Sequence, residues 1–243
     1  MTSVSKILCD YCLGYVDDIR LSDLLAEDTA LFFRRMFGYF RLAVPLFTLP
    51  AEMPEYLLGT KEEPKFKESI FSNTAYTTEK SYDGDIDIHL GPDFSDYDIC
   101  SCRIRESDAL GNIFYTPVSS SYDSASGDVT VHPENGEILP VKTVLEFDFY
   151  KDGYFENDLS PDIMNILGMC FQVIWQDRFN TDWLSNVSKT EDRSFFEQNR
   201  ANKMKADTER LKMLREKLAG EMRRFEQNRY YNKIMSREKR LKF

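Results

Sequence analysis

Apolar side chains in the first fifty positions recur every three or four residues, which is the spacing of one face of a helix. One such run covers residues 7–15, and a wider run covers residues 24–43. Ser22 is a candidate N-cap for the second run. Pro45 is expected to end it, because proline lacks the amide hydrogen that a helix needs. The segment therefore predicts two helices.

From residue 60 to residue 153 the apolar positions alternate with a period of two, as they do in half-buried strands. Strands are predicted at residues 85–90, 99–104, 129–131 and 144–150. The Asn135-Gly136 pair, which lies between two apolar runs, predicts a hairpin turn. Several short strands in about ninety residues favour a small antiparallel sandwich or barrel.

Helical spacing returns after residue 153. Ser160, Pro161 and Asp162 match, in order, an N-cap, a first-position proline and a first-turn acid. After a predicted break near residues 180–190, residues 194–197 form a capping box that opens a long helix. This helix is expected to end near Met235. Its apolar stripe consists of Met204, Leu211, Leu214, Leu218, Met222 and Phe225.

Because the two helical segments flank the strand-rich one, we predict an α+β fold in which both ends of the chain form one helical bundle. The middle is then an inserted antiparallel β-sandwich or barrel-like module. Insertions into surface loops are tolerated, since lengthening a loop costs little closure entropy. The predicted domains are residues 1–59 (N-terminal helices), 60–153 (β module) and 154–243 (C-terminal helices and basic tail).

Charge is distributed unevenly along the chain. The formal net charge is −10, but residues 200–243 contain 15 basic and six acidic residues, so this end carries +9 and the rest carries −19. Such asymmetry predicts that the two parts meet different partners. The most apolar stretch, Leu42–Leu49, covers about eight residues, whereas a membrane span needs roughly 20. Residues 1–6 also show no secretory signal. From these two observations together we expect no membrane contact.

Candidate metal ligands are present at two places. Cys9 and Cys12 have C-x-x-C spacing and Cys100 and Cys102 have C-x-C spacing, so four thiolates could hold zinc if the fold joined them. The odd total of five cysteines favours free thiols in a reducing compartment instead. Residues 83–87 resemble the start of a calcium loop but lack its glycine and its final glutamate. We therefore expect no metal site and no cofactor.

Catalytic motifs are absent from the sequence: it contains no G-x-S-x-G, no H-E-x-x-H and no glycine-rich phosphate loop. The two histidines, His89 and His132, have no nucleophile beside them in sequence. We therefore expect no catalytic residue and no enzyme activity. A triad that only the fold assembles is the remaining alternative.

Cations and aromatic side chains are interleaved at the C-terminal end. Some cations there favour the helix dipole, but the group is larger than the dipole needs. Aromatic anchors among the cations favour docking on an acidic protein surface. Nucleic-acid phosphates and solvent are the alternative partners. The predicted docking residues are Arg223, Arg224, Arg229, Tyr230, Tyr231, Lys233, Arg237, Lys239, Arg240, Leu241, Lys242 and Phe243.

Residues 149–231 resemble the neck proteins of tailed bacteriophages, the head–tail adaptors or connectors that sit beneath the portal. The resemblance lies in the order of a helix, a break, an aromatic-Gln-Ala-Asn sequence and a long helix. The residues that carry it are Phe155, Leu159, Ile166, Leu167, Met169, Trp175, Phe196, Gln198, Ala201, Asn202, Leu211, Leu214, Leu218 and Tyr231.

This resemblance implies a virion structural protein that forms a homo-oligomeric ring, commonly of twelve copies, below the phage portal protein. Double-stranded DNA would pass through the ring without specific binding, and an acidic body would favour passage by repelling the duplex. The family's C-terminal segment typically engages the portal, which here means residues 223–243. Other neck or tail proteins are further expected partners. The implied location is the neck of the virion, after synthesis in the host bacterial cytoplasm.

Three other functions remain as rivals to the adaptor. The first is a DNA-binding protein that uses the basic C-terminal helix. The second is another neck or tail component, such as a stopper. The third is a β module that binds carbohydrate through exposed aromatic rings, for which the candidates are Tyr76, Tyr82, Tyr97 and Tyr122.

Overall fold

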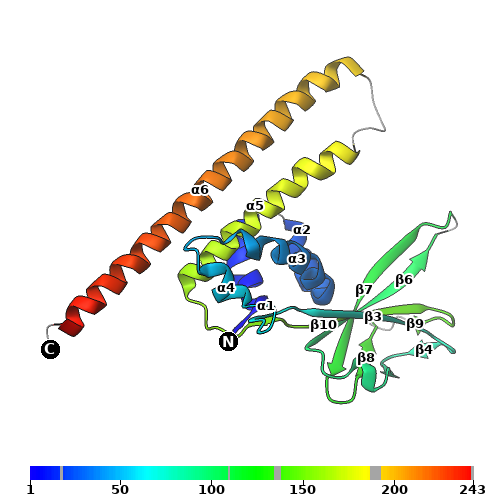
Figure 1. Ribbon diagram of the computed structural model, residues 1–243. Coiled ribbons are helices and arrows are strands. Elements are labelled where there is room, and N and C mark those ends of the chain that lie inside the picture. The colour runs from blue at the N-terminus through cyan, green and yellow to red at the C-terminus, as the bar shows by residue number, and fades with distance from the viewer. Residues whose placement is uncertain (17–18, 109, 134–137, 187–192, 242–243) are drawn as a thin grey trace.

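The computed structural model describes residues 1–16, 19–108, 110–133, 138–186 and 193–241 (Figure 1). Within residues 19–20, 179–186, 193–204 and 234–241 only the backbone is described. The chain has an α+β fold with helices and antiparallel sheets, as the sequence predicts.

Three short helical elements follow one another without a gap near the N-terminus. They are the α-helix α1 (Val4–Ile7), the π-helix η1 (Leu8–Cys12) and the 3-10 helix η2 (Leu13–Tyr15). The longer helices that follow are α2 (Ile19–Glu27) and α3 (Thr29–Ala43). The segment ends with η3 (Val44–Leu46) and α4 (Met53–Leu58).

The predicted N-cap at Ser22 is wrong. Ser22 lies inside α2, and the second helix is divided at Asp28, whose carboxylate accepts a hydrogen bond from the Leu31 amide at 3.0 Å. Asp28 also contacts Arg103 of the β sheet. The helix therefore breaks where a buried side chain both caps α3 and reaches the sheet, a tertiary constraint that local propensity does not contain.

The C-terminal segment forms two long helices, α5 (Pro161–Asn186) and α6 (Arg193–Leu241). α5 begins where the sequence predicts, with the Ile163 amide 3.5 Å from the Ser160 hydroxyl. It ends at Asn186, inside the predicted break near residues 180–190, of which residues 187–190 lie outside the described part. α6 extends beyond the predicted end near Met235 because helix-forming lysine and arginine continue. The capping box at residues 194–197 lies within α6, where side chains are not described.

Both ends of the chain contribute to one hydrophobic core. Phe32 and Phe40 of α3, Phe171 of α5 and Leu211 and Leu218 of α6 all belong to it. α6 packs along α5, with the predicted stripe turned inward: among its described members Leu211, Leu218 and Met222 are buried, and Leu214 and Phe225 are half-buried. The predicted helical bundle of N- and C-terminal segments is therefore present.

The middle of the chain forms a curled, six-stranded antiparallel sheet, which is closer to the barrel-like alternative than to a two-layer sandwich. Its strands, in spatial order, are β3 (Ile70–Thr77), β10 (Val144–Lys151), β6 (Ile99–Ser107), β7 (Ile113–Asp123), β8 (Asp128–His132) and β5 (Ile86–His89). A short 3-10 turn, η4 (Pro92–Phe94), follows β5. The sheet has its own core, which includes Val129, Val131, Leu145 and Phe147.

Two smaller sheets complete the fold. One is three-stranded, with β11 (Tyr154–Phe155) between β1 (Thr2–Ser3) and β2 (Phe66–Lys67), so it joins the start of the chain to both ends of the β region. The other pairs β4 (Tyr82–Asp83) with β9 (Ile138–Leu139). The domain boundaries at residues 59 and 153 stay predictions.

Asn135 and Gly136 of the predicted hairpin lie outside the described residues, but the strands on either side of them do not pair with each other, so the predicted strand pairing is wrong. β8 pairs with β7 and β5, while β9 pairs with β4. The reason is the length of β7, which spans 11 residues. Its first half pairs with β6 and its second half with β8, so the sheet curls and the partner of β8 precedes it in the chain.

No helix in the described part of the chain is long and apolar enough to cross a membrane.

Replacing Leu218 with alanine is expected to lower the free energy of unfolding by about 3 kcal/mol, because it removes a buried side chain from the contact between α5 and α6. Leu218 is 6% exposed, whereas Met213 on the opposite face of the same helix is 62% exposed. Met213→Ala is therefore the matched control. Chemical denaturation of both variants measures the difference, and equal losses would contradict this packing of α6.

Candidate docking surfaces

The described part of the predicted docking segment lies on the outer end of α6. Arg223 and Arg224 are exposed, and Tyr230 and Tyr231 are 68% and 62% exposed. Lys233 is exposed as well, so cations and tyrosine rings share one surface. Predicted docking residues from Arg237 onward lie outside the described side chains.

One predicted docking residue, Arg229, also contacts its own chain. Arg229 donates toward the Met53 sulfur at 3.5 Å and pairs with Glu52 at 3.3 Å, both at the start of α4. One turn earlier, the Phe225 ring packs edge-on against Phe47, with ring centroids 5.9 Å apart. These contacts fix the point from which the end of α6 extends away from the helical body (Figure 1).

A groove of about 420 Å³ lies beside this anchor, between the start of α5 and α6. Asp162 and Asn165 of α5 line one wall, and Arg224 and Asn228 of α6 line the other. The Tyr15 hydroxyl donates to the Asn165 amide oxygen at 2.7 Å, which fixes that amide. Amides and charges of both signs suit hydrogen bonding to a protein segment.

A buried ionic cluster joins α3 to the β sheet. The Arg103 guanidinium on β6 lies 2.8 Å from Asp148, 3.3 Å from Glu146 and 3.4 Å from Asp28. Arg34 of α3 adds a second cation 3.4 Å from Asp148. Burial raises the pKa of Asp148 above its ordinary value, although Arg103 and Arg34 act in the opposite direction. The cluster fixes the sheet to the helical body.

The four cysteines with metal-ligand spacing do not meet. Cys12 belongs to the helical core and Cys102 to the core of the sheet, and Cys9 and Cys100 are half-buried near them. Burial raises the pKa of Cys102 to about 12 and raises the pKa of the Cys12 thiol as well, which keeps both protonated. Among the described residues no group of three or more His, Cys, Asp or Glu side chains could hold a metal ion.

The fold does bring one histidine between an acid and a hydroxyl. His132 lies 3.0 Å from Asp85 through Nδ1 and 3.2 Å from the Ser121 hydroxyl through Nε2, which is the order of a catalytic triad. The aspartate of a working triad is buried, so that it holds the imidazole in one orientation. Here the Asp85 side chain is 66% exposed, and water competes for both hydrogen bonds. The second histidine, His89, pairs with Asp128.

The aromatic side chains proposed for carbohydrate binding are half-buried instead of exposed. Tyr97 and Tyr122 pack on Phe149, with ring centroids 5.4 Å and 5.5 Å away. Tyr76 and Tyr82 pack against the same sheet core. These rings complete the core of the sheet, so the exposed-ring surface was placed on the wrong residues.

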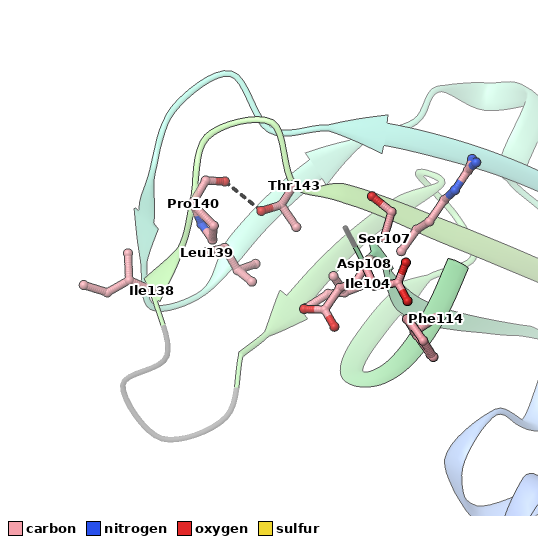
Figure 2. Close-up of a pocket in the computed structure, with 10 residues that line it drawn as sticks. Ile104, Ser107, Asp108, Phe114, Ile138, Leu139, Pro140 and Thr143 are labelled. Atoms are coloured by element: carbon pink, nitrogen blue, oxygen red, sulfur yellow. Dashed lines mark hydrogen bonds between the residues drawn. The ribbon is translucent and has the colours of Figure 1, made fainter. Parts of the chain in front are cut away.

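The sheet carries a different exposed apolar surface at one end. A cavity of about 500 Å³ lies there, with walls from the β6–β7 hairpin on one side and from residues 138–143 on the other (Figure 2). The exposed apolar side chains at this end of the sheet, here called the hairpin surface, are Leu110, Ile113, Phe114, Tyr115, Ile138 and Val141. Of these, Phe114 and Ile138 line the cavity. Ile113 and Tyr115 flank Phe114 in β7 and so point to the opposite face of the sheet, where Arg103 lies over the Tyr115 ring. The sequence reasoning missed this surface. Its signal was Ile113-Phe114-Tyr115, three consecutive apolar residues in a strand that should alternate.

Comparisons with known proteins find little similarity to this chain. No protein-family model matches the chain, and no curated protein matches it. Among solved structures, one similar chain belongs to the "Neck of empty GTA particle computed with C6 symmetry". The likeness covers 75% of this chain and 84% of that one, with 15% sequence identity and a TM-score of 0.20. A TM-score this low does not indicate a shared fold.

Proposed function

We propose that the chain is a structural protein of a bacteriophage neck, a head–tail adaptor that forms a homo-oligomeric ring below the portal. Its basic C-terminal tail, residues 223–243, docks on the portal. The observation that carries the proposal is the end of α6, where exposed cations (Arg223, Arg224 and Lys233) and the exposed rings of Tyr230 and Tyr231 lie on either side of the Arg229 anchor. Tyrosine and arginine are the residues that most often carry binding energy at protein interfaces.

The charge of the remaining chain supports the same role. Residues 60–153 contain 19 acidic and eight basic residues, and most of the acids whose side chains are described are exposed. A ring of such chains would surround its channel with negative potential, which repels passing DNA and keeps it from adhering. The sequence resemblance of residues 149–231 to phage neck proteins points to the same class of protein.

Charge reversal in the tail is expected to weaken portal docking. Arg223→Glu/Arg224→Glu should weaken binding to a purified portal protein from the same genome by at least about tenfold, because it replaces attraction by repulsion. Biolayer interferometry with the full chain measures the change. The matched control is Lys61→Glu/Lys151→Glu, which reverses two exposed lysines of the β region. Equal binding of both variants would contradict docking by the tail.

The DNA-binding alternative makes the opposite prediction in the same experiment. A protein that grips phosphates loses affinity for duplex DNA steeply as salt rises. Salt-sensitive duplex binding by the full chain, lost in Arg223→Glu/Arg224→Glu and not accompanied by portal binding, would replace the adaptor with that function.

A further inference from the structure

The groove between the start of α5 and α6 adjoins the surface proposed for portal docking. Two predicted docking residues, Arg224 and Arg229, line it, and the exposed rings of Tyr230 and Tyr231 follow on the same helix. Its volume of about 420 Å³ falls within the range of ligand-binding clefts in proteins. A protein that binds the cations and rings of the tail therefore also reaches this groove.

Charge does not select the ligand of the groove. Its lining contains two carboxylates, Asp162 and Glu221, and two guanidinium groups, Arg224 and Arg229. Arg224 lies 4.0 Å from Glu221, and Arg229 lies 3.3 Å from Glu52, just before α4. Because carboxylates repel phosphate groups and free anions, the lining does not suit a nucleic acid.

Amide side chains supply the remaining polar lining, and they are Asn165, Asn228 and Asn232. The Asn165 oxygen accepts the hydrogen bond from Tyr15, and among the described residues no acceptor contacts its amino group. The exposed Asn228 amide forms no hydrogen bond with any part of the chain that the structure describes. An amide offers both donors and an acceptor, as does each peptide group of an extended chain. The lining therefore matches a polypeptide backbone better than a charged ligand.

The spacing of two of these amides fits an extended chain rather than a helix. Asn228 and Asn232 lie four residues apart on α6, which separates them by about 6 Å along the helix axis. Two residues of an extended chain span about 6.6 Å, so alternate peptide groups of a segment parallel to α6 meet successive amides. The backbone donors and acceptors of a helix are already paired with one another, so an extended segment is the form that presents them.

We propose that the groove binds one extended segment of the portal protein through hydrogen bonds between its asparagine amides and alternate peptide groups of that segment. Successive side chains of an extended segment point in opposite directions, so every second one enters the groove. There it meets Ile166 and Phe225, the apolar part of the lining, so an apolar side chain fits that position. The inference rests on the proposed adaptor function and deepens it by naming the form of the portal segment that is bound.

Asn228→Leu tests the groove without a change of charge. The substitution keeps a similar side-chain size and removes the amide, so it should weaken binding to the purified portal protein at least about fivefold. Gln227→Leu is the matched control, because Gln227 is an exposed amide at the preceding position of α6 and lies outside the groove. This control should bind as the unchanged chain does. Biolayer interferometry measures the affinities of the full-length variants, and thermal unfolding checks that both fold.

Photocrosslinking identifies the portal segment and tests its conformation. With p-benzoylphenylalanine in place of Asn228, irradiation of the complex with the portal should label one contiguous portal segment, which mass spectrometry locates. A synthetic peptide of that sequence should bind the full chain, and its binding to Asn228→Leu should be weaker at least about fivefold. Methylation of the peptide's backbone nitrogens, one position at a time, should weaken binding at alternate positions only, because alternate peptide groups meet the amides.

Three outcomes would overturn the inference: Asn228→Leu that binds the portal as tightly as Gln227→Leu does, labelling spread over several portal segments, or methylation effects that do not alternate. Each of these, together with portal binding that Arg223→Glu/Arg224→Glu weakens, would contradict the groove and leave the adaptor proposal standing. An unchanged chain that does not bind the portal would contradict both.

Discussion

Arg103→Ala is expected to lower the free energy of unfolding by about 3–5 kcal/mol, because it leaves three carboxylates in a buried site without their shared cation. The Arg103 side chain is 16% exposed, and its partners Asp28 and Asp148 are 6% and 4% exposed. Water therefore cannot replace the lost contacts. Urea denaturation of the variant and of the unchanged chain at pH 7 measures the loss.

The same variant should show a characteristic dependence on pH. The pKa of Asp148 is raised in the folded chain. Between the ordinary pKa of an aspartate and this raised value, the folded state binds more protons than the unfolded state, so stability falls as the pH rises through this range, here called the Asp148 window. Arg103 lowers the pKa of Asp148, so its removal should raise that pKa further. The Asp148 window should then extend to higher pH. The loss caused by Arg103→Ala should therefore be smaller near pH 4 than at pH 7.

Arg105→Ala is the matched control for Arg103→Ala. Arg105 lies on the same strand and is 3.7 Å from Glu146, but its side chain is 46% exposed, and such a pair contributes about 0–1 kcal/mol. A loss for Arg103→Ala that is no larger than this, or that grows as the pH falls, would show that the cluster does not hold α3 to the sheet.

Phe155→Ala should be comparably severe, with an expected loss of about 3–5 kcal/mol. Phe155 is fully buried on β11, and its ring stacks on Phe66 at 4.6 Å and lies edge-on to Phe40 at 6.3 Å. The ring therefore joins the three-stranded sheet to α3, and its removal leaves a cavity at that junction.

Phe114→Ala supplies the comparison for Phe155→Ala. Phe114 is 53% exposed on the hairpin surface, so its removal should change the free energy of unfolding by less than about 0.5 kcal/mol. A large loss of stability for Phe114→Ala would mean that the hairpin surface is part of the core.

Elements with strong periodicity could be predicted from the sequence. The start of α5 at Pro161, the alternating strands β5 and β10 and the inward stripe of α6 all follow from local patterns. Strand pairing could not be predicted, because β7 divides its partners between β6 and β8, and no local signal encodes where a long strand bends. The break at Asp28 depends on Arg103, 75 residues away in sequence.

Of the candidate surfaces, too, one part could be predicted from the sequence and another could not. The cations and tyrosines of the tail were visible as composition, and Arg223, Arg224, Tyr230 and Tyr231 are exposed as that prediction requires. The role of Arg229 as an anchor to Glu52 was not visible, since it depends on where α4 lies. The hairpin surface was missed because apolar residues in a strand are ordinarily assigned to a core, and only the fold shows which ones remain exposed.

The location and copy number of the chain in assembled particles test the central proposal most directly. Cryo-electron microscopy of phage particles that contain the chain should show it as a ring between the portal and the tail, with residues 223–243 of each copy against the portal. The chain in any other place, or a single copy bound along DNA, would contradict the adaptor.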